Sequence, residues 1–297
     1  MTILANSETR VLVQGITGRE AASFTKDMLE YGTKVVSGVT PGKKGHTVHS
    51  VPVFDTVAQA MAFETADAAI ISVPPLMVKE AAQEALLGGI KLLIVVTERV
   101  PRRDTVEFLE LARETGATVI GPNTLGLISP GVVKLGMAGG PVATVEKAYM
   151  PGKVGIASRS GGMTTEIANL LTTNGIGQST CISVGGDPIV GSNFLELAER
   201  FNQDPGTEAM VIFSEPGGVI EEKLAQWVQE NRVTMPIIAF IAGRFVDDMP
   251  GMRFGHAATI VEGDKGSTKS KIEVFEGAGI RVAHAFSDIV TILREVL

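Results

Sequence analysis

Short apolar runs alternate with longer segments of helical spacing through the first half of the chain. RVLVQGITG (10–18) is typical of a buried strand that leads into a turn. REAASFTKDMLEYG then repeats its apolar residues at helical spacing up to Gly32, where we expect the helix to end. Further strands are expected at KVVSGV (34–39), VPVF, AAIISVPP, KLLIVVTE and ATVIGPN (117–123). Strands that alternate with helices predict βαβ units and a parallel sheet.

The second half of the chain repeats this alternation after a break. Residues 125–152 are rich in Gly and Pro and show no clear period, so we interpret them as the connection between two domains. Strands are expected again at KVGIASRSGG, GQSTCISVGGD, EAMVIFSEPGG, PIIAFIAG and RVAHAF. We therefore predict an α/β protein, with a Rossmann-like domain over residues 1–130 and a flavodoxin-like doubly wound domain over residues 131–297.

Composition agrees with this fold class and narrows the function. Hydrophobic residues make up 44% of the chain and glycines number 34, as expected for parallel strands buried on both faces. The net charge is −7 and basic residues form no patch, which argues against a nucleic-acid partner. No apolar run reaches the ~18 residues of a membrane span, and the start lacks the order of a signal peptide. The chain has one cysteine, Cys181, which we expect to be buried. Together, these features predict a cytoplasmic protein without membrane contact.

A glycine turn after the first expected strand raises the question of a nucleotide. Gly15, Gly18 and Ala21 stand between a strand and a helix, where free amides attract phosphate. The next strand runs into TPGKKG, with Lys43 and Lys44 where an NAD-dependent enzyme would carry Asp or Glu. Positive charge there suits a ribose phosphate, as in NADP or coenzyme A. A plain tight turn and two solvated lysines are the alternatives.

A second glycine turn and two loops suggest phosphoryl chemistry. Ser160, Gly161 and Gly162 would present free amides at a helix start, and Glu215 stands where a later strand ends. His256 lies between small residues on a broken, glycine-rich loop. A carboxylate can orient an imidazole that attacks phosphorus, and a helix start can stabilise the transferred group. The alternatives are an ordinary surface histidine and an ordinary helix cap.

Several motifs in order along the chain carry a family resemblance. VQGITGREA, GTKVVSGVTPGKKG, GPNTLGLISPG, GKVGIASRSGG, QSTCISVGGDPIVGSNF, SEPGG and GHAATIVEGDKGS together resemble the α subunit of succinyl-CoA synthetase (succinate–CoA ligase) over essentially the whole chain. The resemblance implies that the first domain binds CoA and that the second carries a transiently phosphorylated histidine, here His256. It also implies a β subunit with an ATP-grasp domain, in an αβ or α2β2 assembly, which binds ATP or GTP with Mg²⁺. No metal site is expected on this chain.

The resemblance carries specific roles to this sequence. Glu215 matches the acidic residue beside the histidine, and Ser160, Gly161 and Gly162 match the helix start that receives the phosphoryl group. The implied CoA contacts are Thr17, Gly18, Arg19, Glu20, Lys43, Val96, Thr97 and Glu98. The implied reaction has three steps: His256 takes a phosphoryl group from the nucleotide, passes it to a carboxylate, and the CoA thiol attacks the resulting acyl phosphate.

Departures from the family pattern concern the acid substrate. The family's S-G-T-L-T-Y-E reads SGGMTTE here, so a substrate-side tyrosine becomes Thr165 and a threonine becomes Gly162. SEPGG and GHAAT also differ from the usual G-E-I-G-G and G-H-A-G-A. RSGGM is similar to the matching part of ATP-citrate lyase and citryl-CoA synthetase. Succinate is the expected small dicarboxylate, and malate or citrate with the same chemistry is the alternative.

Two other classes of protein remain as rivals. An NADP-dependent oxidoreductase would explain the first glycine turn but not SEPGG or GHAAT. A CoA-binding regulatory protein without turnover would not need His256 or Glu215, and both are present.

Overall fold

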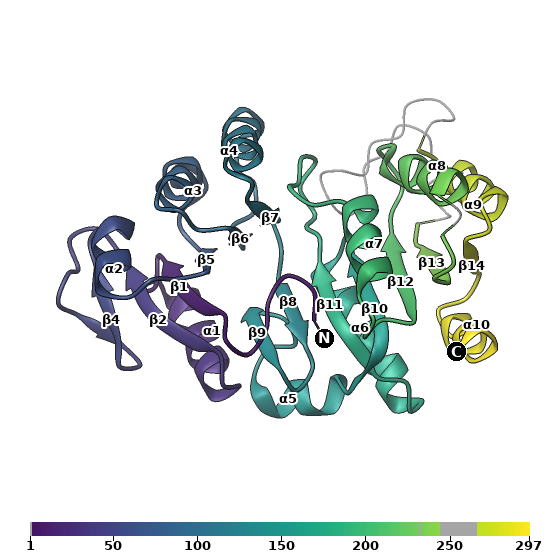
Figure 1. Ribbon diagram of the computed structural model, residues 1–297, viewed down its shortest axis with the longest axis horizontal. Coiled ribbons are helices and arrows are strands. Elements are labelled where there is room, and N and C mark those ends of the chain that lie inside the picture. The colour runs from purple at the N-terminus through teal and green to yellow at the C-terminus, as the bar shows by residue number, and fades with distance from the viewer. Residues whose placement is uncertain (1, 232, 244–265) are drawn as a thin grey trace.

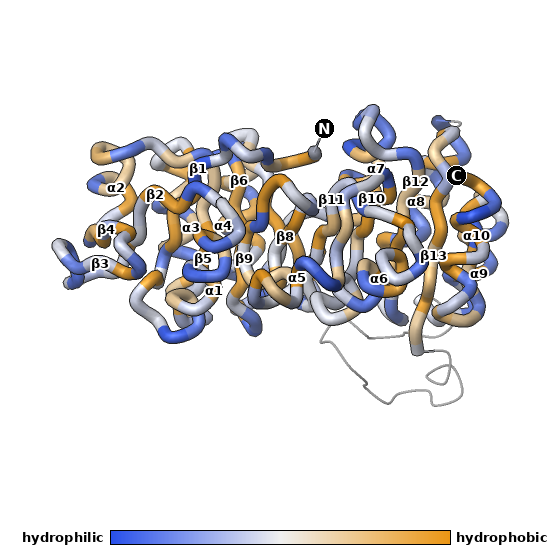
Figure 2. Tube along the Cα trace, turned by 90° about the horizontal axis from the view of Figure 1, so that it is seen from below, coloured by the Kyte–Doolittle hydropathy of each residue, from blue (hydrophilic) through white to orange (hydrophobic). Residues whose placement is uncertain are grey.

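The computed structural model describes residues 2–231, 233–243 and 266–297. It shows two α/β units side by side, the first in purple and blue and the second in teal, green and yellow (Figure 1). Each unit is built on a seven-stranded sheet whose strands follow the apolar runs of the sequence. Figure 2 shows hydrophobic positions concentrated along these strands and hydrophilic ones on the outer helices and loops.

The first unit confirms the predicted Rossmann-like arrangement. Its sheet has the order β3-β4-β2-β1-β5-β6-β7, and all neighbours pair in parallel except β3 with β4. If the short β3 is set aside, this is the doubly wound order, in which strands are added first on one side of β1 and then on the other. The strand order reverses between β1 and β5. The strands are β1 (Arg10–Gln14), β2 (Lys34–Val39), β3 (Thr47–Val48), β4 (Val51–Phe54), β5 (Ala68–Ile71), β6 (Leu92–Val95) and β7 (Thr118–Ile120). The helices are α1 (Arg19–Glu30), α2 (Val57–Phe63), the 3₁₀ turn η1 (Pro75–Met77), α3 (Val78–Leu87) and α4 (Arg102–Thr115).

The second unit has the predicted flavodoxin-like order. Its parallel strands lie as β14-β13-β12-β10-β11, with the reversal between β10 and β12. The strands are β8 (Gly126–Ser129), β9 (Val133–Gly136), β10 (Pro151–Ser158), β11 (Gln178–Ser183), β12 (Ala209–Ser214), β13 (Ile237–Ile241) and β14 (Arg281–Ala283). The helices are α5 (Val142–Ala148), α6 (Gly161–Thr173), α7 (Phe194–Gln203), α8 (Ile220–Asn231), α9 (Thr268–Gly277) and α10 (Asp288–Val296).

The interpretation of residues 125–152 as a connection is wrong. Strands β8 and β9 form an antiparallel hairpin that adds to the edge of β11, and α5 follows it. The second sheet therefore takes its first strand from Gly126–Ser129, ahead of the expected domain boundary at residue 130. The hairpin strands are fully buried, so this segment belongs to the core of the second unit.

One hydrophobic cluster joins the two units. It contains Phe24 and Met28 of α1, Leu135 of β9 and Phe201 of α7. Two further clusters lie on the other faces of the sheets, one under α2, α3 and α4 and one under α5, α6 and α10. Because apolar surface is buried between the units, their strand ends are held in fixed relative positions. In the described part of the chain, no helix is both long enough and apolar enough to cross a membrane.

Candidate active site

A cleft of about 850 Å³ lies at the reversal point of the first sheet. Its wall comes from the carboxyl ends of β1, β2 and β5 and from the start of α3, the place where doubly wound sheets bind ligands. Gly15 follows β1 with φ of 82°, and a Cβ there would lie 2.1 Å from the carbonyl oxygen of Ser72. Glycine is thus required for β1 and β5 to approach each other at the floor of the cleft.

Two of the residues expected to bind CoA lie on the wall of this cleft. Thr17 and Gly18 line it, and the Thr17 hydroxyl donates to Thr40 Oγ1 at 3.2 Å. Lys43 is exposed on the turn just beyond Thr40, to whose carbonyl oxygen its backbone N–H donates at 3.1 Å. A lysine on that turn can reach a ligand at the mouth of the cleft.

The other expected CoA residues lie beside the cleft. Arg19 and Glu20 line a separate cavity of about 640 Å³ between α1 and the segment after β9. Val96 is buried at the end of β6, and Thr97 Oγ1 donates to the carbonyl oxygen of Val73 at 2.7 Å, which supports a residue of the cleft wall. The exposed Glu98 carboxylate pairs with Arg99 at 3.6 Å.

The turn between β10 and α6 is tightly fixed by hydrogen bonds. Ser160 caps α6, and its Oγ accepts the N–H of Met163 at 3.4 Å. The Ser158 hydroxyl donates to the carbonyl oxygen of Ser160 at 2.6 Å, and Ser158 Oγ accepts the Ser160 N–H at 3.1 Å. Gly161 and Gly162 form the first turn of α6, where helix geometry leaves backbone N–H groups without partners in the helix. These amides and the positive end of the helix dipole favour an anion at this point.

The two glycines of this turn differ in their surroundings. A Cβ at Gly161 would lie 2.2 Å from Leu125 Cγ, so only glycine fits against the hairpin. A Cβ at Gly162 would lie 3.9 Å from Ser160 Oγ, which is an ordinary contact. Gly162 is exposed, so its missing side chain leaves open space at the start of α6.

The loop after β12 carries Glu215 and is anchored by a buried ion pair. Gly217 and Gly218 have φ of 94° and 70°, which glycine adopts without strain. Lys271 of α9 donates to the carbonyl oxygen of Gly217 at 2.8 Å and forms an ion pair with Glu221 at the start of α8. The other carboxylate oxygen of Glu221 accepts the Ser214 hydroxyl at the end of β12.

A pocket of about 140 Å³ brings Glu215 together with two arginines that the sequence analysis missed. Arg159 follows β10 and Arg102 begins α4 of the first unit. Arg159 is 8% exposed and donates to the carbonyl oxygen of Asp187 at 3.2 Å. Burial lowers the pKa of its guanidinium, and the nearby Glu221, Glu215 and Asp187 oppose that shift. SRSGG could have pointed to Arg159, but no sequence signal links residue 102 to Glu215.

Thr165 faces α5. Its hydroxyl shares a hydrogen bond of 2.9 Å with the Tyr149 hydroxyl at the end of that helix. Burial raises the pKa of Tyr149, so the phenol stays protonated and able to donate.

His256 lies outside the described residues. Within the described ranges, no cluster of His, Cys, Asp and Glu could hold a metal ion.

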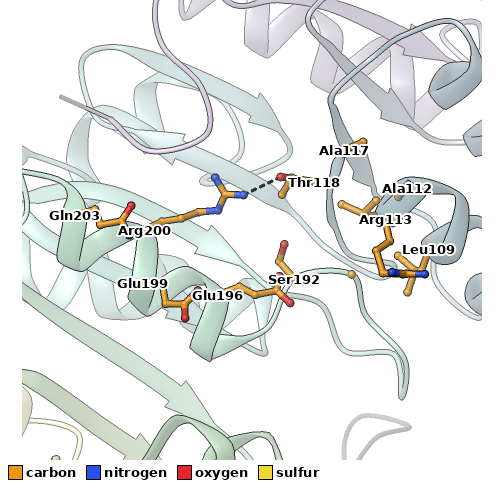
Figure 3. A pocket seen from close by; sticks show the side chains of 12 residues that line it. Leu109, Ala112, Arg113, Ala117, Thr118, Ser192, Glu196, Glu199, Arg200 and Gln203 are labelled. Carbon is orange, nitrogen blue, oxygen red and sulfur yellow. Dashed lines mark hydrogen bonds between the residues drawn. The ribbon is translucent and has the colours of Figure 1, made fainter. Parts of the chain in front are cut away.

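A further groove of about 530 Å³ lies where the two units meet, between α4 and α7 (Figure 3). Arg200 reaches across it to donate to Thr118 Oγ1 at 3.0 Å. Glu196 and Glu199 from α7 and Arg113 from α4 also line it, so charges of both signs are present. None of the expected site residues lies there, and we assign the groove to packing between the units.

Comparisons with known proteins agree with this geometry. A family model described as a CoA binding domain matches residues 6–99, and one described as CoA-ligase matches residues 157–280. The chain is 42% identical over 297 residues to an ADP-forming succinate–CoA ligase α subunit of Archaeoglobus fulgidus, covering 100% of this chain and 99% of that one. It is 40% identical over 296 residues to an ADP-forming sulfoacetate–CoA ligase subunit of Acholeplasma, covering 100% and 98%.

A solved structure shows the same fold in a larger protein. ATP citrate lyase of Methanothrix soehngenii, in complex with citrate and coenzyme A, superposes with a TM-score of 0.92 at 27% identity. The match covers 99% of this chain but only 50% of the citrate lyase chain. Fold, cleft and family models together define a CoA ligase with a CoA-binding domain followed by a ligase domain. The chain belongs to the family of succinate–CoA ligase α subunits.

Proposed function

We propose that this chain is the α subunit of a nucleotide-dependent acid–CoA ligase and that its acid is succinate. The observation that carries the proposal is the pairing of two strand-end sites in two units that share a hydrophobic cluster. A CoA-sized cleft lies at the reversal point of the first sheet, and an anion-binding turn with Glu215 lies at that of the second. If the chain were an NADP-dependent oxidoreductase, the second site would have no role. The match to the CoA-binding family model also favours CoA over NADP as the ligand of the cleft.

The proposed reaction uses these two sites in sequence. His256 takes a phosphoryl group from a nucleoside triphosphate, with Glu215 orienting the imidazole and the amides of Gly161 and Gly162 stabilising the charge. A carboxylate of the acid then attacks phosphorus, which frees His256 and forms an acyl phosphate. The thiolate of CoA attacks the acyl carbon, phosphate leaves, and the thioester is formed.

Partners and location follow from the same proposal. A β subunit with an ATP-grasp domain supplies ATP or GTP with Mg²⁺, in an αβ or α2β2 assembly in the cytoplasm. Several relatives are named α subunits, which supports a partner chain. CoA contacts Thr17 and Gly18 on the wall of the cleft, Lys43 at its mouth, and Arg19 and Glu20 at the adjoining start of α1.

The test is a thioester assay on the assembled enzyme. The chain is co-expressed with its β subunit and supplied with nucleotide, Mg²⁺, CoA and succinate, malate, citrate or sulfoacetate in turn. We expect succinyl-CoA to form with the highest kcat/KM. A higher value for malate or citrate would move the assignment to those acids. Sulfoacetate is included because a ligase for it is about as similar to this chain as the succinate enzymes are. Absence of any thioester would contradict the function itself.

Lys43 is expected to recognise the 3′-phosphate of CoA. A charge-assisted contact contributes about 1.5–3 kcal/mol, so Lys43→Ala should weaken CoA binding roughly tenfold or more. Binding of dephospho-CoA, which lacks that phosphate, should hardly change. Calorimetry with both ligands checks this, and equal losses for the two would rule out a 3′-phosphate role.

Thr165 is expected to bear on the choice of acid. With succinate as substrate, Thr165→Tyr should lower kcat/KM by less than about tenfold, or 1.4 kcal/mol. If the natural acid is bulkier, kcat/KM for that acid should instead fall by several factors of ten, while kcat/KM for succinate should change little. Tyr149→Phe is the matched control, because it removes the hydrogen bond to Thr165 without adding volume at the start of α6. Phosphorylation of His256 should survive in every variant, since that step precedes the acid. An unchanged ranking of the acids would show that selection lies elsewhere.

A further inference from the structure

The small pocket beside Glu215 is assembled from both units. Arg102 comes from the first unit, and the other side chains and backbone come from the second. The described residues that line it are Arg102, Arg159, Pro188, Glu215, Pro216, Gly217, Gly218, Ile220 and Glu221. Its volume of about 140 Å³ is well below the roughly 300–1,000 Å³ of cavities that hold whole ligands. The pocket therefore has the size for the charged head group of a ligand.

The described wall of this pocket carries two arginines and two glutamates, and the glutamates are not shared equally between the arginines. Glu221 is neutralised by Lys271, with which it forms an ion pair. Arg159 has both Glu215 and Asp187 near it, which leaves Arg102 as the guanidinium of the described wall that has no ion pair. Arginine stays protonated in proteins and presents several donors in a planar fork that matches oxyanions. An oxyanion in the pocket would be the counter-ion of Arg102.

Arg102 differs from its neighbour on the same helix. Arg103 forms an ion pair with Glu107 one turn along α4, with 2.8 Å between Nε and Oε1. Among the described residues, no hydrogen bond or ion pair engages the Arg102 guanidinium. The two adjacent arginines thus have the same chemistry, but only one is directed to the pocket.

The loop that leads to Arg102 is fixed against the second unit. Asp187, which is buried, accepts Asn123 Nδ2 at 3.1 Å and the backbone N–H of Arg99 at 3.5 Å on the same oxygen. Its carbonyl oxygen accepts Arg159 at 3.2 Å. One residue therefore connects the segment after β6, the segment after β7 and the arginine at the wall of the pocket. Such anchoring holds a charged group in place before a ligand arrives.

We propose that Arg102 is an oxyanion-binding residue that the first unit contributes to the Glu215 pocket. The ligand is a small oxyanion, either the carboxylate or sulfonate of the acid or the phosphate that leaves when the thioester forms. The inference rests on the proposed function and extends it, since it makes the chemistry depend on residues from both units.

The test compares Arg102→Ala with Arg103→Ala in the complex with the β subunit. Both variants remove one arginine from the exposed start of α4, so a melting curve should show the two to be about equally stable. We expect Arg102→Ala to raise KM about tenfold or more for the acid in the forward direction, or for inorganic phosphate in the reverse direction. The substrate whose KM rises, either the acid or inorganic phosphate, identifies the source of the oxyanion. Arg102→Lys should fall between wild type and alanine, because lysine keeps the charge but loses the fork.

The contrary results are equally distinct. If both KM values stay within about twofold of those for Arg103→Ala, or if only the KM for CoA rises, Arg102 does not bind the oxyanion. Wild-type activity separates this outcome from failure of the proposed function. An active wild type with an indifferent Arg102→Ala overturns the inference alone, whereas a wild type without thioester formation overturns the function on which it rests.

Discussion

Replacing His256 with asparagine should abolish the transfer of phosphate from nucleotide to this chain. Asparagine keeps the polarity of the position but has no nucleophilic ring nitrogen, so the covalent intermediate cannot form. Loss of a nucleophile lowers turnover by more than roughly 10³-fold. The complex of this chain with the β subunit is incubated with γ-labelled nucleotide, and the acid-labile label on this chain is measured. Label that persists in His256→Asn would place the phosphate on another residue.

Two further variants make this result specific. His284→Asn changes another of the four histidines, at the far end of the second unit, and should label like wild type. Glu215→Gln removes the charge expected to orient the imidazole and keeps the shape of the side chain. Removal of an orienting carboxylate lowers the rate by about 10⁴-fold in the Ser-His-Asp triad, so Glu215→Gln should label slowly and incompletely. Full-speed labelling of Glu215→Gln would show that Glu215 has a structural role only.

Most of the strands could be predicted from the sequence because they are buried on both faces. KVVSGV and VPVF coincide with β2 and β4, and the other predicted runs contain the observed strand, except that β10 begins two residues before KVGIASRSGG. Burial on both faces demands continuous Val, Ile and Leu, and that demand is visible in a single sequence. The glycine turns could be predicted as well, since a strand that ends at Gln14 or Ser158 must reach its helix within a few residues.

The hairpin of β8 and β9 escaped because its glycines resemble those of a linker. A Cβ at Gly126 would lie 1.9 Å from the carbonyl oxygen of Leu135, and Gly126 and Gly136 both have φ of 91°. These glycines therefore allow two strands to approach closely, and they do not mark a flexible connection. Strands as short as β8 and β9 also show no clear hydrophobic period.

The pocket with Arg102 and Arg159 could not be predicted for a different reason. Residues 102 and 215 belong to different units, and their proximity depends on how the two units pack. Local pattern carries no information on that packing. The expected role of Glu215 came from its place after a strand, whereas its charged neighbours needed the three-dimensional fold.

Lys271→Met should destabilise the chain more than any surface substitution. The Lys271 side chain is 0% exposed and that of Glu221 is 5% exposed, so the variant leaves a carboxylate buried without its cation. Breaking such a pair costs about 3–5 kcal/mol, because the remaining charge is not solvated. Urea unfolding of the α–β complex, followed by the second unit's only tryptophan, Trp227, measures the change. Lys153→Met is the matched control, since its pair with Glu208 is exposed and contributes at most about 1 kcal/mol.

The double variant Lys271→Met, Glu221→Gln separates stability from function. With the charge of Glu221 also removed, most of the lost free energy of unfolding should return, because apolar or neutral replacements of buried pairs are often tolerated. Activity should not return with it. Lys271 also donates to the carbonyl oxygen of Gly217, and that contact holds the loop that carries Glu215. We therefore expect a folded double variant whose His256 labels slowly. A double variant that is both stable and fully active would show that the loop keeps its position without the lysine.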